Sequence, residues 1–141
     1  MTETRGAAAL RVDRPRLLTA TKAVTVLYAA LVLLQAIIAG RGWFKDFDLI
    51  ETHGQIGEGV FLVAVVQAVL AFLVFGARSW PALASAVLLV LTGVQLVLGY
   101  ASADSSTAAS LHIPNGVLIF GLATVLTMSV VRVEQRAGAA G

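Results

Sequence analysis

Apolar residues gather in four long runs along the chain, and short polar stretches separate these runs. The runs lie near residues 22–40, 55–77, 82–101 and 111–131. Each is close to the ~20 residues that a helix needs to cross the hydrocarbon core of a bilayer. Backbone groups in lipid must be paired within their own segment, and the alternation typical of a soluble sheet is missing. The pattern predicts an all-α integral membrane protein, a four-helix antiparallel bundle with short connections.

The polar ends of the chain are expected to be tails. Residues 1–21 are mostly small or polar and include four arginines, which favours a cytoplasmic tail or a short interfacial helix. The apolar run after Lys22 is longer than the core of a signal peptide, and three more runs follow it. We therefore interpret this run as an uncleaved first span. Residues 132–141 are expected to form a second cytoplasmic tail.

Composition supports a lipid environment and narrows the candidate chemistry. Hydrophobic residues make up 58% of the 141 residues and charged residues only 13%, which is far from the balance of soluble domains. The lipid bilayer is therefore the expected partner. No basic patch with interleaved aromatics is present, so nucleic-acid binding is not predicted. Cysteine is absent, which excludes disulfides, iron–sulfur clusters and thioether-attached haem. A bound metal would need nitrogen or oxygen ligands.

Basic residues are divided unevenly between the two expected sides of the membrane. Only Arg41 and Lys45 fall on one side. The other eight fall on the opposite side: Arg5, Arg11, Arg14, Arg16, Lys22, Arg78, Arg132 and Arg136. The positive-inside rule then predicts a multi-pass protein of the cell membrane with both termini in the cytoplasm. Loops 41–54 and 102–110 would face outward.

The chain's two histidines, His53 and His112, stand where the second and fourth apolar runs begin. Each is followed by a glycine four residues later and a phenylalanine eight residues later: Gly57 and Phe61, and Gly116 and Phe120. One shift of 59 residues relates the two sets, which indicates two repeated helical hairpins. Such copies would be parallel and related by an axis near the membrane normal. We therefore expect the histidines at the same depth, facing each other across the bundle.

This arrangement is typical of a haem site. Two neutral imidazoles at matched depth can bind haem iron from opposite sides. The glycines lie one turn deeper on the same helix face, where a missing side chain lets a flat ring approach the backbone. The phenylalanines, another turn deeper, would wall the floor of the pocket. The alternative is that the histidines bond water or headgroups and that the glycines serve close helix packing.

Two charged residues lie near the first histidine. Arg41 is a candidate partner for a haem propionate, because its planar guanidinium suits a carboxylate. A solvated loop charge, balanced by neighbouring acids, is the other interpretation. Glu51 stands two residues before His53 and would orient it or exchange protons with the outside.

Polar residues inside the spans are candidates for function or for helix association. Glu58 should not share the face of the histidine. It is expected to relay protons, to pair with Gln35 or Gln95, or to reach the interface. Both glutamines are expected to form interhelical hydrogen bonds, as are Gln67 and Thr92.

A proline and an asparagine follow the second histidine. Pro114 is expected to mark the start of the fourth helix, because the N–H that proline lacks would be unpaired there. Asn115 would cap the helix or bond inward.

The chain resembles one half of haem A synthase, a membrane enzyme built from two similar four-helix bundles. In that family the second and fourth helices of each bundle carry a histidine pair as haem ligands at their outer ends. His53 and His112 match those positions, within a resemblance that covers about residues 22–131. The family's catalytic half has a glutamate three residues before its first ligand, whereas Ile50 stands there in this chain. A second bundle would require a dimer, and the cysteine pair of some members is absent. The chain is also similar to small bacterial four-helix membrane proteins of unknown function.

Three functions follow as hypotheses. The first is a b-type cytochrome with one haem b between the histidines, for electron transfer or haem handling. The second is a haem-free accessory or scaffold subunit whose small-residue faces dock another membrane protein, with homo-oligomers also expected. The third is a proton-coupled transporter that uses Glu58 and the histidines. No nucleophile–base set or phosphate loop is present, so an enzyme is the less favoured class.

Overall fold

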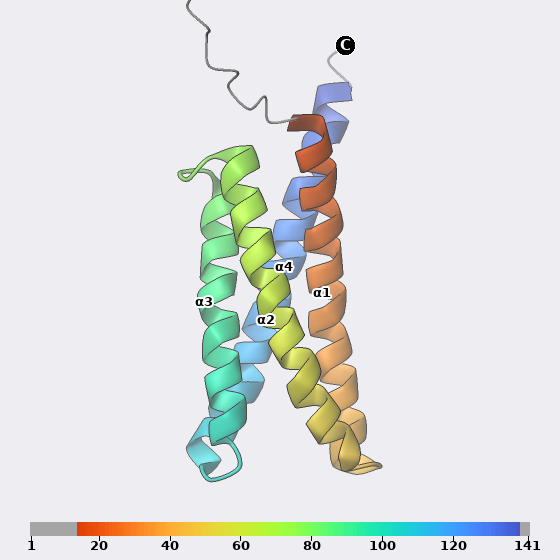
Figure 1. The fold of residues 1–141 in the computed structure, drawn as a ribbon, viewed down its shortest axis with the longest axis vertical. Helices are drawn as coiled ribbons and strands as arrows, with labels where there is room; N and C mark the ends of the chain where they lie inside the picture. Colours follow the sequence, from red (N-terminus) through yellow and green to blue (C-terminus); the bar gives the residue numbers. More distant parts are fainter. Residues whose placement is uncertain (1–13, 139–141) are drawn as a thin grey trace, which may run out of the picture.

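The computed structural model describes residues 14–138, and this part of the chain forms four helices without a strand. They are α1 (Arg14–Phe44), α2 (Asp48–Phe75), α3 (Trp80–Ala101) and α4 (Ser106–Gly138). Consecutive helices run in opposite directions (Figure 1). All four are long and apolar enough to cross a membrane. The all-α, four-helix architecture predicted from the apolar runs is confirmed.

Helices that follow one another in the chain pack together, and α1 closes the ring on α4. The helices α2 and α4 therefore occupy opposite corners of the bundle. Figure 1 shows that α2 crosses the bundle obliquely: it lies beside α3 near the Arg78 turn and beside α1 at the other end. The hairpin of α1 and α2 thus diverges from the hairpin of α3 and α4 toward that other end.

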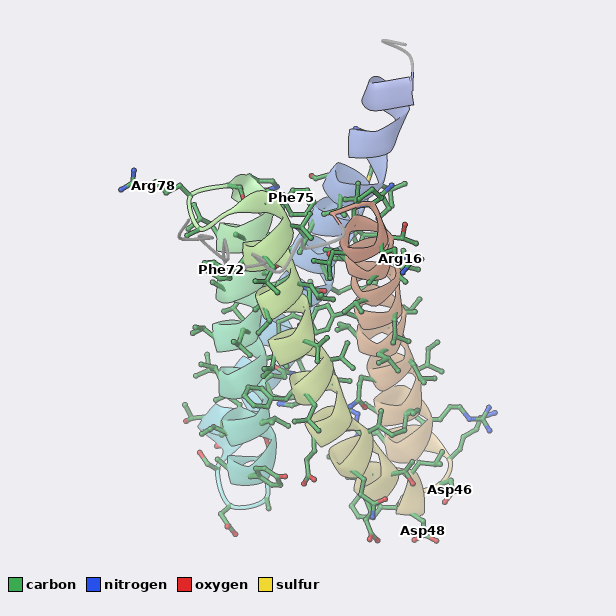
Figure 2. All side chains as sticks on the ribbon, turned by 45° about the horizontal axis from the view of Figure 1, so that its top comes forward. Arg16, Asp46, Asp48, Phe72, Phe75 and Arg78 are labelled. Atoms are coloured by element: carbon green, nitrogen blue, oxygen red, sulfur yellow. The ribbon has the colours of Figure 1, made fainter. Side chains whose placement is uncertain are left out.

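Charge distinguishes the two ends of the bundle. Arg16 and Arg78 lie at one end, whereas Asp46 and Asp48 lie at the other (Figure 2). We call these the arginine end and the histidine end, because the helix segments with the two histidines belong to the latter.

The connections at the histidine end are shorter than the predicted loops. The helix α1 continues to Phe44 and α4 already begins at Ser106. A Cβ on Gly42 would stand 2.7 Å from Ile50 Cδ1, so this glycine lets α1 and α2 pack together up to their ends. At the start of α4, the hydroxyl of Ser105 accepts a hydrogen bond from the amide of Ala108 at 3.2 Å, which caps the helix. The histidines consequently lie more than one turn inside α2 and α4.

Two further boundaries differ from expectation. Pro114 stands inside α4 and does not mark its start, because the serine cap lies well before it. The tails predicted for 1–21 and 132–141 fall partly outside the described residues. Within the described range, α1 already begins at Arg14 and α4 continues to Gly138.

The interior combines small apolar residues with polar ones, and the outside is apolar. Leucine, valine and isoleucine side chains point outward from the helices, as Leu62, Val90 and Val117 do with 64–68% exposure. Alanines on α2 and α3 let the helices approach closely. Among the described residues, five buried side chains are polar: Thr21, Thr25, Gln67, Ser85 and Thr92. An apolar exterior around a partly polar interior suits a lipid solvent.

Candidate functional site

The two histidines face each other across the bundle. The imidazole of His53 comes from α2 and that of His112 from α4, the helices at opposite corners. Their ring centroids are 6.0 Å apart, and the ring planes meet at 68°. Both side chains are partly buried. The packing of the four helices therefore brings together two side chains that are far apart in the sequence.

His53 is held by a reciprocal pair of hydrogen bonds with α1. Its Nδ1 lies 3.1 Å from the backbone oxygen of Gln35. A carbonyl oxygen only accepts, so Nδ1 carries the hydrogen and Nε2 keeps its lone pair. In return, Gln35 Nε2 donates to the backbone oxygen of His53 at 3.0 Å. This arrangement selects the tautomer whose Nε2 can bind a metal ion.

His112 is positioned in a different way. Gln95 Nε2 donates to its backbone oxygen at 3.0 Å, which matches the bond made by Gln35. The ring lies against α3, where a Cβ on Gly99 would stand 3.2 Å from His112 Cε1. The Nδ1 atom of His112 is buried and has no hydrogen-bond partner among the described residues. Both histidines thus accept a glutamine hydrogen bond at their backbone oxygen, but within residues 14–138 only His53 has a hydrogen-bond partner at Nδ1.

Gly57 and Gly116, one helical turn after the two histidines, have another role than we expected. A Cβ on Gly57 would stand 3.2 Å from Gln35 Nε2, and one on Gly116 would stand 3.1 Å from Gln95 Nε2. The space beside each glycine is therefore taken by a glutamine amide, so the glycines do not themselves make room for a flat cofactor ring. Each glycine lets an amide reach the histidine carbonyl one turn earlier in the helix. Close helix packing, the alternative interpretation, describes these glycines correctly.

The phenylalanines do not form a common floor below the histidines. Phe61 is partly buried, and its ring lies 3.5 Å from the position of a Cβ on Gly93. Phe120 is 38% exposed, whereas its neighbour Ile119 is buried. Eight residues of α-helix overshoot two turns by roughly 80°. The seventh residue after each histidine, Val60 or Ile119, therefore faces the core instead.

The charged candidates lie outside this arrangement. Arg41 is exposed in the last turn of α1, where a cation is favoured by the helix dipole. Glu51 is exposed and accepts a hydrogen bond from Gln55 Nε2 at 3.2 Å. The Nδ1 atom of His53 bonds to the backbone of Gln35 and not to Glu51, and proton exchange by Glu51 stays a prediction.

Glu58 has a partner that the sequence did not indicate. The hydroxyl of Tyr100 donates to Glu58 Oε1 at 2.6 Å, and the pair is exposed on the outside of α2 and α3. The carboxylate therefore bonds to the end of α3 and pairs with neither glutamine; its contact with the interface and its role in proton relay stay predictions. Only the packing of α2 on α3 reveals this tyrosine, because no spacing in the sequence links the two residues.

Asn115 completes the polar contacts around Gln95. Its Nδ2 donates to Gln95 Oε1 at 2.6 Å and to the backbone oxygen of Leu91 at 3.1 Å. Because Gln95 Oε1 is engaged in this way, its Nε2 points toward His112. The expected inward bonding of Asn115 and the interhelical bonds of Gln35 and Gln95 are confirmed. Thr92 likewise bonds across the bundle, to the hydroxyl of Tyr28.

The donor set is limited to the two imidazoles. Among residues 14–138, no group of three or more histidine, cysteine or acidic side chains could hold a metal ion. Two opposed imidazoles suit an iron whose remaining positions are filled by a porphyrin.

Comparison with known proteins gives no relative: no protein-family model, curated protein or solved structure matches the chain. The resemblance to haem A synthase stays a prediction.

Proposed function

We propose that the chain is a small b-type cytochrome of the cell membrane that binds one haem between His53 and His112. The observation that carries this proposal is the facing pair of imidazoles, 6.0 Å apart, on opposite corners of the bundle. Bound haem would supply one-electron redox chemistry. The role of the protein would be electron transfer or haem handling.

The separation of the rings fits coordination of one ion from both sides. Imidazole nitrogens bind metal ions at about 2.0–2.1 Å, and the ring centre lies about 1 Å further, so two such rings have centroids roughly 6 Å apart. The observed 6.0 Å agrees with this sum. An edge-to-face contact between two rings without a ligand has a separation in the same range, so the optical test below distinguishes the two cases.

The hydrogen bond of His53 also supports a ligand role. Histidines that bind metals nearly always donate their other ring N–H to a carbonyl or a carboxylate, which fixes the tautomer and the direction of the ring. The carbonyl of Gln35 accepts such a bond from Nδ1. The Nε2 atom of this ring is then directed to a ligand by the backbone of α1.

We also propose that the two hairpins are repeated copies. The supporting observation is that Gln35 with His53 and Gln95 with His112 make the same 3.0 Å bond, each beside a glycine. The glutamines are 60 residues apart and the histidines 59. A common contact geometry explains why a one-residue difference between the copies is tolerated.

The proposed orientation follows from charge. Among the described residues, the arginine end carries Arg16, Lys22, Arg78 and Arg132 and the histidine end only Arg41 and Lys45. The positive-inside rule assigns the arginine end to the cytoplasm. The haem would then lie near the outer face. Arg41, in the last turn of α1 at the histidine end, is the proposed partner of a propionate.

The haem-free accessory role is the weaker candidate. It is motivated by small-residue faces, and some of these residues pack inside the bundle: Ala64, Ala71, Ala82 and Ala84 are all nearly fully buried. The small residues left for docking are those on the outside, such as Ala36, Gly59 and Gly121.

The test is a reduced-minus-oxidised optical spectrum of the purified protein after anaerobic reduction. We expect bands of a six-coordinate, low-spin b-type haem, and loss of these bands in His53→Ala and in His112→Ala. Gln55→Ala, an exposed change in the same part of α2, is the matched control and should keep them. A wild-type protein without haem bands, indistinguishable from both histidine variants, would contradict the proposal.

A further inference from the structure

Four polar side chains, one from each helix, lie at a similar depth near the arginine end. In α2, Gln67 comes 14 residues after His53. In α3, Ser85 comes 14 residues before Gly99, the residue against which the ring of His112 lies. Fourteen helical residues span about 21 Å. Because α2 and α3 run in opposite directions, Gln67 and Ser85 are level with each other.

The other two members of this layer, Thr25 and Thr127, are already joined. The hydroxyl of Thr127 in α4 donates to the backbone oxygen of Thr25 in α1 at 3.1 Å. The hydroxyl of Thr25 donates within its own helix, to the backbone oxygen of Lys22. One side of the layer, between α1 and α4, is thus closed by a direct hydrogen bond.

The other side of the layer, between α2 and α3, is not closed by the protein. Gln67 and Ser85 are both 0% exposed. Neither amide atom of Gln67 nor the hydroxyl of Ser85 has a hydrogen-bond partner among the described residues. Figure 1 shows α2 beside α3 at this end of the bundle, so the two side chains belong to helices in contact.

The hydroxyl of Ser85 differs from other hydroxyls in the helices. Thr21, Thr124 and Ser129 each donate to the carbonyl four residues earlier in the same helix. That bond satisfies a hydroxyl in lipid without any partner on another helix. Ser85 does not make it, although it is fully buried. The hydroxyl of Ser85 is therefore free to bond a partner outside its own helix.

We propose that Gln67 and Ser85 form a binding site for water between α2 and α3. The amide of Gln67 offers two donors and an acceptor, and a hydroxyl both donates and accepts. A cation would suit only the oxygens and an anion only the N–H and O–H groups, whereas water matches both. Alanines flank the pair on the same helix faces, namely Ala64, Ala71 and Ala82, and their small side chains favour a small ligand.

The site would close the polar layer at the arginine end. A bound water needs two to four polar partners, and the two side chains supply them from both helices. In hydrocarbon no solvent reaches an unpaired group, so an internal partner is strongly favoured. The water would link the two hairpins on the α2–α3 side, as the threonine bond links them on the α1–α4 side. This inference does not depend on haem binding.

Proton-detected solid-state NMR on the full chain in phosphatidylcholine bilayers tests the site directly. The chain has five glutamines, and comparison with Gln67→Leu identifies the side-chain amide signal of Gln67. We expect this signal to receive magnetisation from water at short mixing times, as exposed Gln55 does. Weaker transfer in Ser85→Ala would support the shared site. Transfer to Gln55 with none to Gln67 would overturn the proposal.

A thermal-unfolding cycle gives a second readout with the variants Gln67→Leu, Ser85→Ala and the double variant. If one water joins both side chains, each single change lowers the unfolding midpoint by a few degrees, and the double change lowers it by no more than the larger single change. Ser129→Ala, whose hydroxyl bonds within its own helix, is the matched control. Single changes that raise the midpoint and add up in the double variant would mean that the groups are unpaired, and would overturn the proposal.

Discussion

The two ends of the bundle use polar side chains to join different pairs of helices. In the interior of the histidine end, glutamine amides join α1 to α2 and α3 to α4, within each hairpin, whereas the exposed bond from Tyr100 to Glu58 joins α3 to α2 on the outside. At the arginine end, the bond from Thr127 to Thr25 joins α1 to α4, between the hairpins. The difference follows the oblique course of α2 in Figure 1, which brings it to α1 at one end and to α3 at the other.

This difference explains how the histidines can face each other without helix contact. Bonds within each hairpin fix the histidine backbones of α2 and α4 and leave the centre between the hairpins to the rings. The positions of the polar contacts, more than their number, therefore determine where a ligand can be held.

The largest loss of stability is expected from filling the glycine positions at the histidine end. Gly116→Leu would place its side chain into Gln95 Nε2, which already lies 3.1 Å from a Cβ there. Overpacking of this kind costs about 1–3 kcal/mol. Gly121→Leu, with nothing within 4 Å of its Cβ, is the matched control in the same helix. Thermal unfolding in detergent should separate the two variants, and equal stability would contradict the assigned role of Gly116.

A smaller effect is expected from removing the glutamines. Interhelical hydrogen bonds in membranes contribute about 0.6 kcal/mol on average and up to about 1.7 kcal/mol. Gln95→Leu should lie at the upper end of this range, because it also leaves Asn115 without its 2.6 Å acceptor. Gln35→Leu should cost less, since Gln35 Oε1 has no partner to lose. Denaturant titration of both variants checks the order, and the reverse order would show that the hairpins are held differently.

The smallest effect is expected at the arginine end. Thr127→Val removes the single bond to Thr25 and should cost about 0.6 kcal/mol. Thr124→Val is the control, because the hydroxyl of Thr124 bonds to Phe120 in its own helix. The spectrum of bound haem should be the same in Thr127→Val as in wild type. A changed haem spectrum in this variant would show that the two ends are coupled.

The sequence predicted the four helices well, because hydropathy over long runs is a strong signal in membrane proteins. It predicted the ends of the helices less well. The contact between Gly42 and Ile50 and the cap at Ser105 extend α1 and α4 beyond the apolar runs. Such contacts depend on neighbouring helices and leave little trace in composition.

For the candidate site, the spacing of the histidines was informative and the spacing of the phenylalanines was not. The 59-residue shift between the histidines predicted that their rings lie at one depth, and the ring centroids are 6.0 Å apart. The eight-residue step to Phe120 overshoots the core face, which Ile119 occupies. Close helix packing was an alternative for Gly57, but its partner, the amide of Gln35, was not predicted because it belongs to another helix. Tyr100 was missed for the same reason, since only the packing of α2 on α3 brings it to Glu58.

The most direct test of the central claim is an absorption titration of the haem-free protein with haemin. We predict saturation at one haem per chain in wild type, with the spectrum of a low-spin iron bound by two imidazoles. His53→Ala and His112→Ala should each lose this spectrum, because each removes one of the two rings that lie 6.0 Å apart. A wild-type titration without a saturating step, or one identical in both histidine variants, would contradict the claim that the histidine pair binds haem.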